Sequence, residues 1–253
     1  MRIPGAAFAL LLLNVTSSTA ADLRVYSGGA PQETLKLLGP AFEQATGHRL
    51  DYTFAIVGAI RQRLEAGEKA DVVLLPVPLI EALEKSGKVR AGSRSMLARV
   101  GIAIVVREGA PKPDVSTPKA LRATLMRARA ITHSDPQTPS GRHVDTMLAQ
   151  MGVEETPDRK IVPRSAIGGG AEFIAKGEVE IGLYLLSEVL TAKGVAVAGM
   201  LPEVLQNYVA YAGAVLADSP SPDAAAEFIR FVGDPSKQEQ WKATGFESIG
   251  KGN

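Results

Sequence analysis

Short apolar runs alternate along this chain with stretches in which apolar residues recur every three or four positions. The first pattern predicts buried strands and the second predicts amphipathic helices. The clearest helical face follows Ser140, where Val144, Met147, Leu148 and Met151 fall on one side. Strands that alternate with helices predict an α/β fold with mostly parallel sheets flanked by helices. The predicted strands occupy residues 23–26, 50–54, 71–75, 100–106, 130–132, 160–163, 179–185, 195–197 and 209–217.

Proline and glycine mark several helix boundaries. Pro31 suits the first position of a helix, and the pair Gly39 and Pro40 is expected to interrupt that helix. Thr117 and Pro118 are typical of an N-cap and the first helical position. The apolar run VGIAIVV at 100–106 predicts one strand covered on both faces. The polar, Pro-rich stretch 108–118 follows it and predicts a crossing between two lobes.

Four loops that follow predicted strands are candidates for a ligand site, because ligands in such sheets bind outside the carboxyl ends of the strands. These loops lie at 27–29, 55–58, 133–140 and 165–170. Three of the four are rich in Gly or Ser, so they can offer backbone N–H groups where a helix begins.

The stretch 131–151 combines the features of an anion site. Ser140 is expected to cap a helix, Gly141 lets a ligand approach the backbone, and Arg142 puts a cation in the first turn. The first turn of a helix has unpaired N–H groups and the positive end of the helix dipole. These features predict a seat for an anion, although an ordinary capped helix shares them.

The N-terminus has the pattern of a secretory signal peptide, predicted over residues 1–21. Arg2 precedes an apolar run at 6–13, and small residues follow at 16–21. Cleavage is expected before Ala21 or Asp22. The run is too short to span a membrane. We therefore expect a periplasmic protein, and the absence of Cys argues against a lipid anchor and is compatible with the bacterial periplasm.

The charge balance argues against nucleic acid as a partner. The predicted leader carries one of the 28 basic residues, which leaves 27 beside 27 acidic residues. A balanced chain lacks the positive field that polyanions need.

The residue types near the third loop could in principle form a catalytic set or a metal site. Ser140, His143 and Asp135 suggest a nucleophilic set, but no G-x-S-x-G elbow is present, so we expect no catalytic residues and no enzyme. His133, Asp135 and His143 could bind a metal, but their spacing matches no standard metal motif. The sequence therefore predicts neither a metal nor a cofactor.

The chain resembles the periplasmic substrate-binding proteins of ABC importers, with type II topology, in the branch of the molybdate-binding proteins. The resemblance covers nearly all of residues 22–253, and it depends on the order and spacing of several weak motifs. These motifs are RVYSGGA at 24–30, AFEQATG at 41–47, EAGEKADVVLLP at 65–76, SDPQTPSGRH at 134–143, GEVEIGLYLLSEVL at 177–190, and AAEFIRFVGDPSKQEQWKATGF at 225–246.

The resemblance implies two lobes joined by a hinge, with a ligand cleft between them. It implies one lobe at 22–106 plus 207–253 and a second at 107–206, with crossings near Arg107 and Gln206. It further implies a monomer that gives a small anion to an ABC permease in the inner membrane. A sensor that presents its ligand to a receptor instead of transporting it would have the same sequence features.

The chain departs from the oxyanion donors of the molybdate binders. Their first-loop hydroxyl falls at Ala30, their second-loop hydroxyl falls among residues 55–57, and their late Tyr falls at Leu185. Tyr184 is expected to face away, because neighbouring strand residues point to opposite faces. Arg142 could bind a carboxylate through two hydrogen bonds, with Arg61 and Arg164 as weaker candidates.

These departures favour a small organic anion, such as a carboxylate, over molybdate or tungstate, which remain the alternative. The predicted ligand-binding residues come from the four loops and the start of the helix after the third. They are Ser27, Gly28, Gly29, Ala30, Ile56, Val57, Gly58, Ser140, Gly141, Arg142, Ile167 and Gly168.

Overall fold

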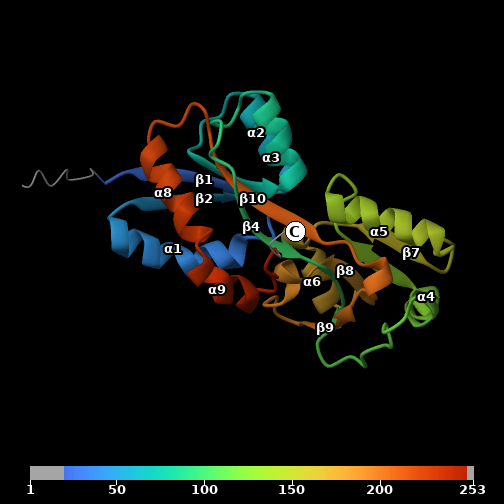
Figure 1. Cartoon of the computed structure of the whole chain (residues 1–253). Coiled ribbons are helices and arrows are strands. Elements are labelled where there is room, and N and C mark those ends of the chain that lie inside the picture. Colours follow the sequence, from blue (N-terminus) through green and yellow to red (C-terminus); the bar gives the residue numbers. More distant parts are fainter. Residues whose placement is uncertain (1–19, 250–253) are drawn as a thin grey trace, which may run out of the picture.

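The computed structural model describes residues 20–249, so all but the last two residues of the predicted signal peptide lie outside the described residues. The described strands form two separate five-stranded sheets, each covered by helices (Figure 1). The strands are β1 (Asp22–Ser27), β2 (Arg49–Phe54), β3 (Val72–Pro76), β4 (Ser95–Val100), β5 (Ile102–Arg107), β6 (Ala130–His133), β7 (Lys160–Pro163), β8 (Ile181–Leu185), β9 (Val195–Met200) and β10 (Val209–Val215).

Helices connect most of the strands, as the alternating pattern predicts. The α-helices are α1 (Gln32–Thr46), α2 (Val57–Glu65), α3 (Val77–Lys85), α4 (Pro118–Arg127), α5 (Pro139–Gln150), α6 (Gly170–Ala175), α7 (Leu186–Val189), α8 (Pro222–Val232) and α9 (Gln238–Ala243). Three short 3₁₀ turns complete the described elements: η1 (Ala166–Gly168), η2 (Glu203–Leu205) and η3 (Pro235–Lys237). No helix in the described part of the chain is both long enough and apolar enough to cross a membrane.

The two sheets have the same plan. The first has the order β2-β1-β3-β10-β4 and the second β7-β6-β8-β5-β9. In each, three strands pair in parallel, and the fourth in the order pairs antiparallel with both of its neighbours. That reversed strand, β10 or β5, is the one that the chain enters directly after crossing from the other sheet. The predicted α/β fold with mostly parallel sheets is confirmed.

The first crossing lies at Gly101, between β4 and β5. The single strand predicted at 100–106 is therefore wrong, and so is a crossing near Arg107, because β5 already pairs in the second sheet. The run is apolar throughout because β4 and β5 are buried in neighbouring parts of one core. Burial alone does not reveal where a chain leaves one sheet for another.

The return crossing contains Gln206, between β9 and β10, where the second crossing is predicted. Its side chain joins the two connecting segments, because Gln206 Oε1 accepts from Ile102 N at 2.8 Å and its Nε2 donates to Ile102 O at 3.0 Å. A Cβ on Gly101 would lie 3.1 Å from the Gln206 amide, so this position suits a glycine.

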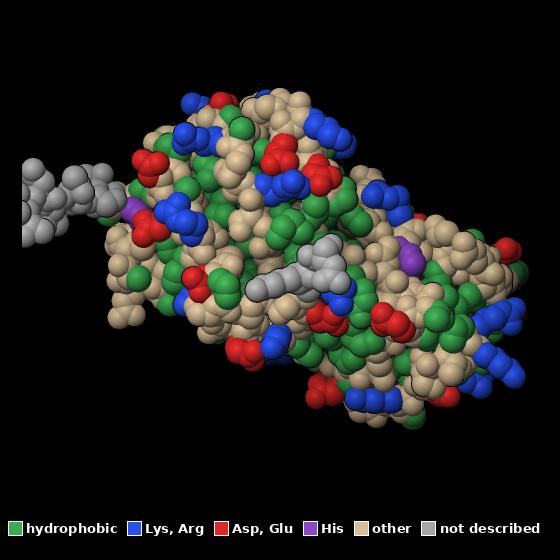
Figure 2. Space-filling model, viewed as in Figure 1, with side chains coloured by type: hydrophobic (Ala, Val, Ile, Leu, Met, Phe, Trp, Pro, Cys, Tyr) green, Lys and Arg blue, Asp and Glu red, His purple; other side chains and the backbone are tan. Residues whose placement is uncertain are grey.

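Of two features predicted from proline, the helix start at Thr117 is confirmed and the interruption at Gly39 and Pro40 is wrong. Thr117 caps α4 by accepting from Ala120 N at 3.1 Å, which confirms that prediction. The interruption expected at Gly39 and Pro40 is wrong, because α1 runs through both residues. The surface carries mixed charge, with Lys, Arg, Asp and Glu interspersed over both lobes (Figure 2).

Candidate functional site

A small cavity lies between the two sheets, at the loops that follow their parallel strands. Its volume is about 30 Å³, close to the share of one water molecule in the liquid. Both lobes and the returning strand β10 supply its walls. The lining residues are Gly29, Ile56, Val57, Ser134, Thr138, Pro139, Ser140, Ser165, Ile167, Leu185, Glu188, Val209 and Tyr211.

The loop after β1 forms the first-lobe wall, and its glycines let the second lobe come close. A Cβ on Gly29 would lie 2.9 Å from Ile167 Cγ2, which comes from the opposite lobe. A Cβ on Gly28 would lie 3.0 Å from Val57 Cγ1 and 3.6 Å from the Tyr211 ring. The two lobes therefore touch across the cavity through this loop.

The start of α5 forms part of the second-lobe wall. Thr138, and not Ser140 as predicted, is the N-cap, and its hydroxyl accepts from Gly141 N at 3.0 Å. Gly141 packs against the preceding turn so closely that a Cβ there would lie 2.0 Å from Asp135 O. Ser140 is buried and is free of the capping role, so its side chain lines the cavity.

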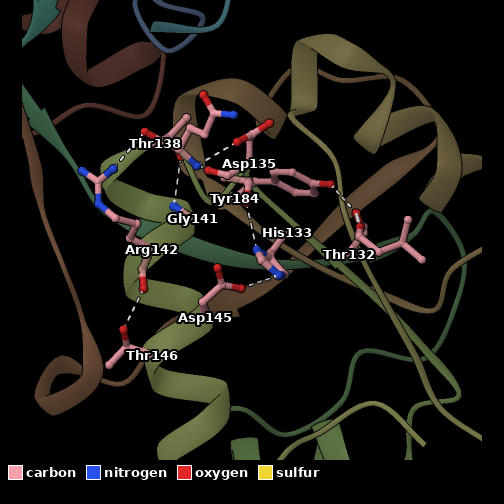
Figure 3. Close-up of polar contacts among 12 residues, drawn as sticks. Thr132, His133, Asp135, Thr138, Gly141, Arg142, Asp145, Thr146 and Tyr184 are labelled. Carbon is pink, nitrogen blue, oxygen red and sulfur yellow. Dashed lines mark hydrogen bonds and ion pairs between the residues drawn. The ribbon is translucent and has the colours of Figure 1, made fainter. Parts of the chain in front are cut away.

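Arg142 is exposed and does not line the cavity. Its guanidinium donates to Gln137 O at 3.0 Å, along the loop that precedes α5 (Figure 3). This contact fixes the arginine to the loop outside the cavity.

The other sequence-predicted residues fall into two groups. Gly29, Ile56, Val57, Ser140 and Ile167 line the cavity. The remainder are not among the lining residues: Ser27, Gly28, Ala30, Gly58, Gly141, Arg142 and Gly168. Of these, Ser27 is fully buried and donates to Gly28 O at 2.9 Å. A Cβ on Gly58 would lie 3.5 Å from Gln137 Oε1, so Gly58 faces the second lobe at the edge of the cavity.

Four hydroxyl-bearing residues line the cavity but are not among the predicted ligand-binding residues: Ser134, Thr138, Ser165 and Tyr211. The Ser134 hydroxyl is buried and has no hydrogen-bond partner among the described residues. Burial raises the pKa of Tyr211 well above its ordinary value, so this phenol stays neutral and can donate. Ser134 and Ser165 follow β6 and β7 and lie in two of the four candidate loops, but the sequence did not indicate which side chains of those loops face the ligand.

Tyr184 points away from the cavity, as strand alternation predicts. Its hydroxyl donates to Arg164 O at 2.9 Å and pairs with Thr132 Oγ1 at 2.8 Å (Figure 3). Leu185, its neighbour in β8, faces the cavity instead. The cavity thus has an apolar side chain where the molybdate binders are expected to have a tyrosine hydroxyl.

Glu188 is the only acidic or basic residue among the described residues that line the cavity. It lies in the short helix α7, directly after β8. Burial raises the pKa of its carboxyl to about 7, so this group exchanges its proton near neutral pH. Glu188 is not among the ligand-binding residues predicted from the sequence.

The histidines near the third loop have structural partners. His133 Nδ1 lies 2.9 Å from Ser134 O and its Nε2 lies 3.1 Å from Asp145 Oδ1 (Figure 3). His143 Nε2 lies 2.8 Å from Leu205 O. The nearest described polar partner of Ser140 Oγ is Thr138 Oγ1, at 3.3 Å, so the Ser140, His143 and Asp135 set is not assembled.

Comparisons with known proteins agree with this geometry. An aconitate isomerase from Pseudomonas sp is 32% identical over 98% of this chain and 97% of its own. A molybdate-binding protein, ModA, from Azotobacter vinelandii is 26% identical over 91% of each chain. The solved structure of the Azotobacter vinelandii periplasmic molybdate-binding protein superposes with a TM-score of 0.74, at 20% identity, over 88% of this chain and 98% of that one.

These matches confirm the resemblance that the sequence motifs indicate. The model of the family described as "Bacterial extracellular solute-binding protein" matches residues 23–247, which is nearly all of the described chain. The two sheets, the cavity between them and the molybdate-binding relatives are all typical of that family. The chain belongs to the bacterial extracellular solute-binding protein family.

Proposed function

We propose that this protein captures a small organic anion of the carboxylate class between its lobes and delivers it to an ABC importer from the periplasm. The observation that carries the proposal is the apolar lining of both walls. Ile56 and Val57 lie on one side, and Ile167 and Leu185 lie on the other. A carbon skeleton gains from contact with such side chains, whereas a tetrahedral metal oxyanion presents only oxygen atoms.

The polar groups of the cavity suit carboxylate oxygens. Ser134, Ser140, Ser165 and Tyr211 offer neutral hydroxyl donors from two loops, the start of α5 and one strand. The similarity to an aconitate isomerase over nearly the full chain supports the same ligand class, because aconitate is an unsaturated tricarboxylate. We therefore place polycarboxylates first among the candidate ligands.

Ligand entry requires the lobes to separate. Sites for small organic ligands commonly enclose about 300–1,000 Å³, whereas this cavity holds about 30 Å³. Gly101 and the segment around Gln206 connect the two sheets, so these segments are the natural hinge. We propose that the lobes rotate apart about them to admit the ligand.

A thermal-shift and calorimetric panel tests the ligand class. The panel contains cis- and trans-aconitate, citrate, succinate, sulfate, molybdate and tungstate. A ligand present at 100 times its Kd stabilises the native state by about 2.7 kcal/mol, which raises the Tm of a chain of this size by roughly 5–10 °C. We expect such shifts with one or more carboxylates. A comparable shift with molybdate or tungstate alone would overturn the proposal.

Delivery to an importer is tested separately in the cells that produce the protein. Deleting its gene should abolish uptake of the radiolabelled ligand found by the panel, and a plasmid copy should restore uptake. Unchanged uptake with confirmed binding would favour the ligand-presenting sensor over the transport component.

Isomerisation of an unsaturated carboxylate is the second candidate function, and Glu188 is the observation that favours it. Such a reaction moves a proton and a double bond, so it needs one group that accepts a proton and returns it. A carboxyl with a pKa of about 7 inside the cavity suits that role at neutral pH. The relative named aconitate isomerase supports the same reaction class.

Incubation of the purified protein with trans-aconitate tests this candidate. Proton NMR in D₂O would follow both the appearance of the cis isomer and the uptake of deuterium. Turnover that Glu188→Gln abolishes would establish the enzyme. Binding without conversion or exchange would leave capture and delivery as the function.

A further inference from the structure

The Glu188 carboxyl belongs to the second lobe and lies close to the first. Glu188 is carried by α7 of the second lobe, yet its Oε1 lies only 3.2 Å from the position that a Cβ would take on Gly29 of the first lobe. It lines the cavity and also an outer groove that contains Gln32, Ser187 and Thr191. A ligand bound between the lobes at the Gly29 loop would therefore lie close to this carboxyl.

No described group neutralises this carboxyl. Glu188 forms no hydrogen bond or ion pair with another described residue, and the described lining of the cavity and the outer groove contains no Lys, Arg or His. The titratable groups around it are Tyr211 from β10, Glu33 from α1 and Glu172 from α6, together with Tyr184 from β8, which feels its charge although the Tyr184 hydroxyl points away from the cavity. Two are neutral phenols and two are acids.

Burial without a cation favours the uncharged form of a carboxyl. The pKa of Glu188 is accordingly raised to about 7, with burial as the cause. A carboxylate ligand placed beside it would raise this pKa further, because two like charges in a small space repel each other. The bound state is therefore the state in which Glu188 keeps its proton.

Two buried hydroxyls beside this carboxyl also lack partners. Ser134 Oγ in the cavity and Ser187 Oγ at the outer groove have no hydrogen-bond partner among the described residues. Ser134 and Ser187 are only 4% and 3% exposed. Buried polar groups without a partner are uncommon and are costly unless something else satisfies them. Both hydroxyls point to a polar ligand at the place where Glu188 lies.

We infer that Glu188 determines ligand specificity by donating a hydrogen bond from its protonated carboxyl to a carboxylate group of the ligand. This inference rests on the proposed function, because it requires a carboxylate ligand in the cavity. A carboxylic acid that binds a carboxylate forms a short, charge-assisted hydrogen bond. Once Glu188 loses its proton, the same contact becomes repulsive, and binding must then be accompanied by proton uptake.

The test compares wild-type protein with Glu188→Gln from pH 5.5 to 8.5. Calorimetry would use the best carboxylate of the panel. Wild-type affinity should be about tenfold weaker at pH 8 than at pH 6, because each pH unit above the pKa costs up to a factor of ten. The Gln amide also donates a hydrogen bond but does not titrate, so the ratio of the two affinities isolates Glu188 from ionisation of the ligand itself.

Glu172→Gln is the matched control, because Glu172 is an acid of the outer groove that pairs with Lys176 at 3.8 Å. This control should keep the wild-type pH profile. Glu188→Ala, which cannot donate, should bind at least tenfold more weakly than Glu188→Gln at pH 6. Parallel profiles for wild type and Glu188→Gln would overturn the inference while leaving carboxylate capture intact. Failure of every carboxylate to bind wild type at pH 6 would overturn the proposed function, and the inference with it.

Discussion

Tyr211 brings a neutral phenol to the cavity from the strand that returns to the first sheet. Its ring packs edge-on against Phe246, with centroids 6.0 Å apart, and lies beside the Gly28 loop. The hydroxyl is therefore held in place by packing on the ring alone. Replacing Tyr211 by phenylalanine therefore removes the hydrogen-bond donor and keeps the ring packing that the fold uses.

Tyr211→Phe should weaken carboxylate binding by about 10- to 100-fold, because a hydrogen bond to a charged group contributes roughly 1.5–3 kcal/mol. The Tm without ligand should change little, since the ring contacts stay. Calorimetry at pH 6 measures the loss. Tyr208→Phe is the control, because its hydroxyl donates to Glu203 outside the cavity. Equal affinity for Tyr211→Phe and wild type would remove this phenol from the site.

Glu188 should also give the ligand-free protein a pH-dependent stability. Its pKa is about 7 in the folded state against an ordinary value of 4.5. A raised carboxyl pKa means that the folded state holds the proton more tightly, so the contribution of Glu188 to stability is complete below about pH 4.5 and is lost as pH rises to about 7. Urea unfolding should show wild type losing up to about 3 kcal/mol relative to Glu188→Gln across that window. If the difference in unfolding free energy between the two proteins did not change with pH, the Glu188 carboxyl would be solvated in the folded state as it is in the unfolded chain.

The apolar pattern that predicts α5 does not fix the residue at which this helix begins. The apolar face at Val144, Met147 and Leu148 predicts the helix well, because that face is buried. The cap is shifted by two residues, since Thr138, Pro139 and Ser140 can each begin a helix in sequence terms. The structure selects Thr138, whose hydroxyl accepts from Gly141 N and donates to Asp135 O, while the missing Cβ of Gly141 lets the preceding turn pack against it.

Thr138→Ala and Ser140→Ala separate the two capping assignments. Loss of an N-cap hydroxyl costs about 1 kcal/mol of stability. We expect that loss for Thr138→Ala, whose hydroxyl caps Gly141 N and also donates to Asp135 O, and a smaller one for Ser140→Ala. Equilibrium urea denaturation of both variants gives the comparison. A larger loss for Ser140→Ala would return the capping role to Ser140.

Elements that cross between the lobes are the ones that sequence patterns describe least well. The loops after β1, β2, β6 and β7 are predictable, because strand ends in parallel sheets meet at one edge. The break at Gly101 is not, since the last residue of β4, Val100, and the first of β5, Ile102, are both apolar and fully buried. Tyr211 was missed although it lies in a predicted strand, because its exposure to the cavity depends on where β10 runs after the return crossing. Glu188 follows β8, another parallel strand, but the loop after that strand was not among the four candidate loops.

Residues 20–249 form a pair of similar sheets, and within this range the chain passes from one sheet to the other only at the two crossings. Gln206 ties these crossings together through both polar atoms of Ile102. These contacts hold the two connecting segments side by side, as the proposed hinge requires. The family and the overall architecture follow from the order of the motifs, whereas the ligand depends on side chains that meet only after both crossings are made.

The absence of Cys from the chain allows the cleft to be locked with a single engineered disulfide. Gly29 and Ile167 face each other across the cavity, and a Cβ on Gly29 would lie 2.9 Å from Ile167 Cγ2. Because one C–C bond of about 1.5 Å separates Cγ2 of Ile167 from its Cβ, the two Cβ atoms would lie at most about 4.4 Å apart, and a disulfide joins Cβ atoms roughly 3.5–4.5 Å apart. Oxidised Gly29→Cys/Ile167→Cys should therefore hold the lobes together with room for about one water.

We expect the oxidised double variant to bind no carboxylate, and the reduced form to bind again, because only the reduced form can open. Calorimetry before and after addition of dithiothreitol measures both states. Each single cysteine variant is the control for the substitution itself, and neither should respond to the reductant. Binding of equal strength in the oxidised and reduced forms would show that the ligand is held outside the cleft, since a site of about 30 Å³ cannot accept it while closed.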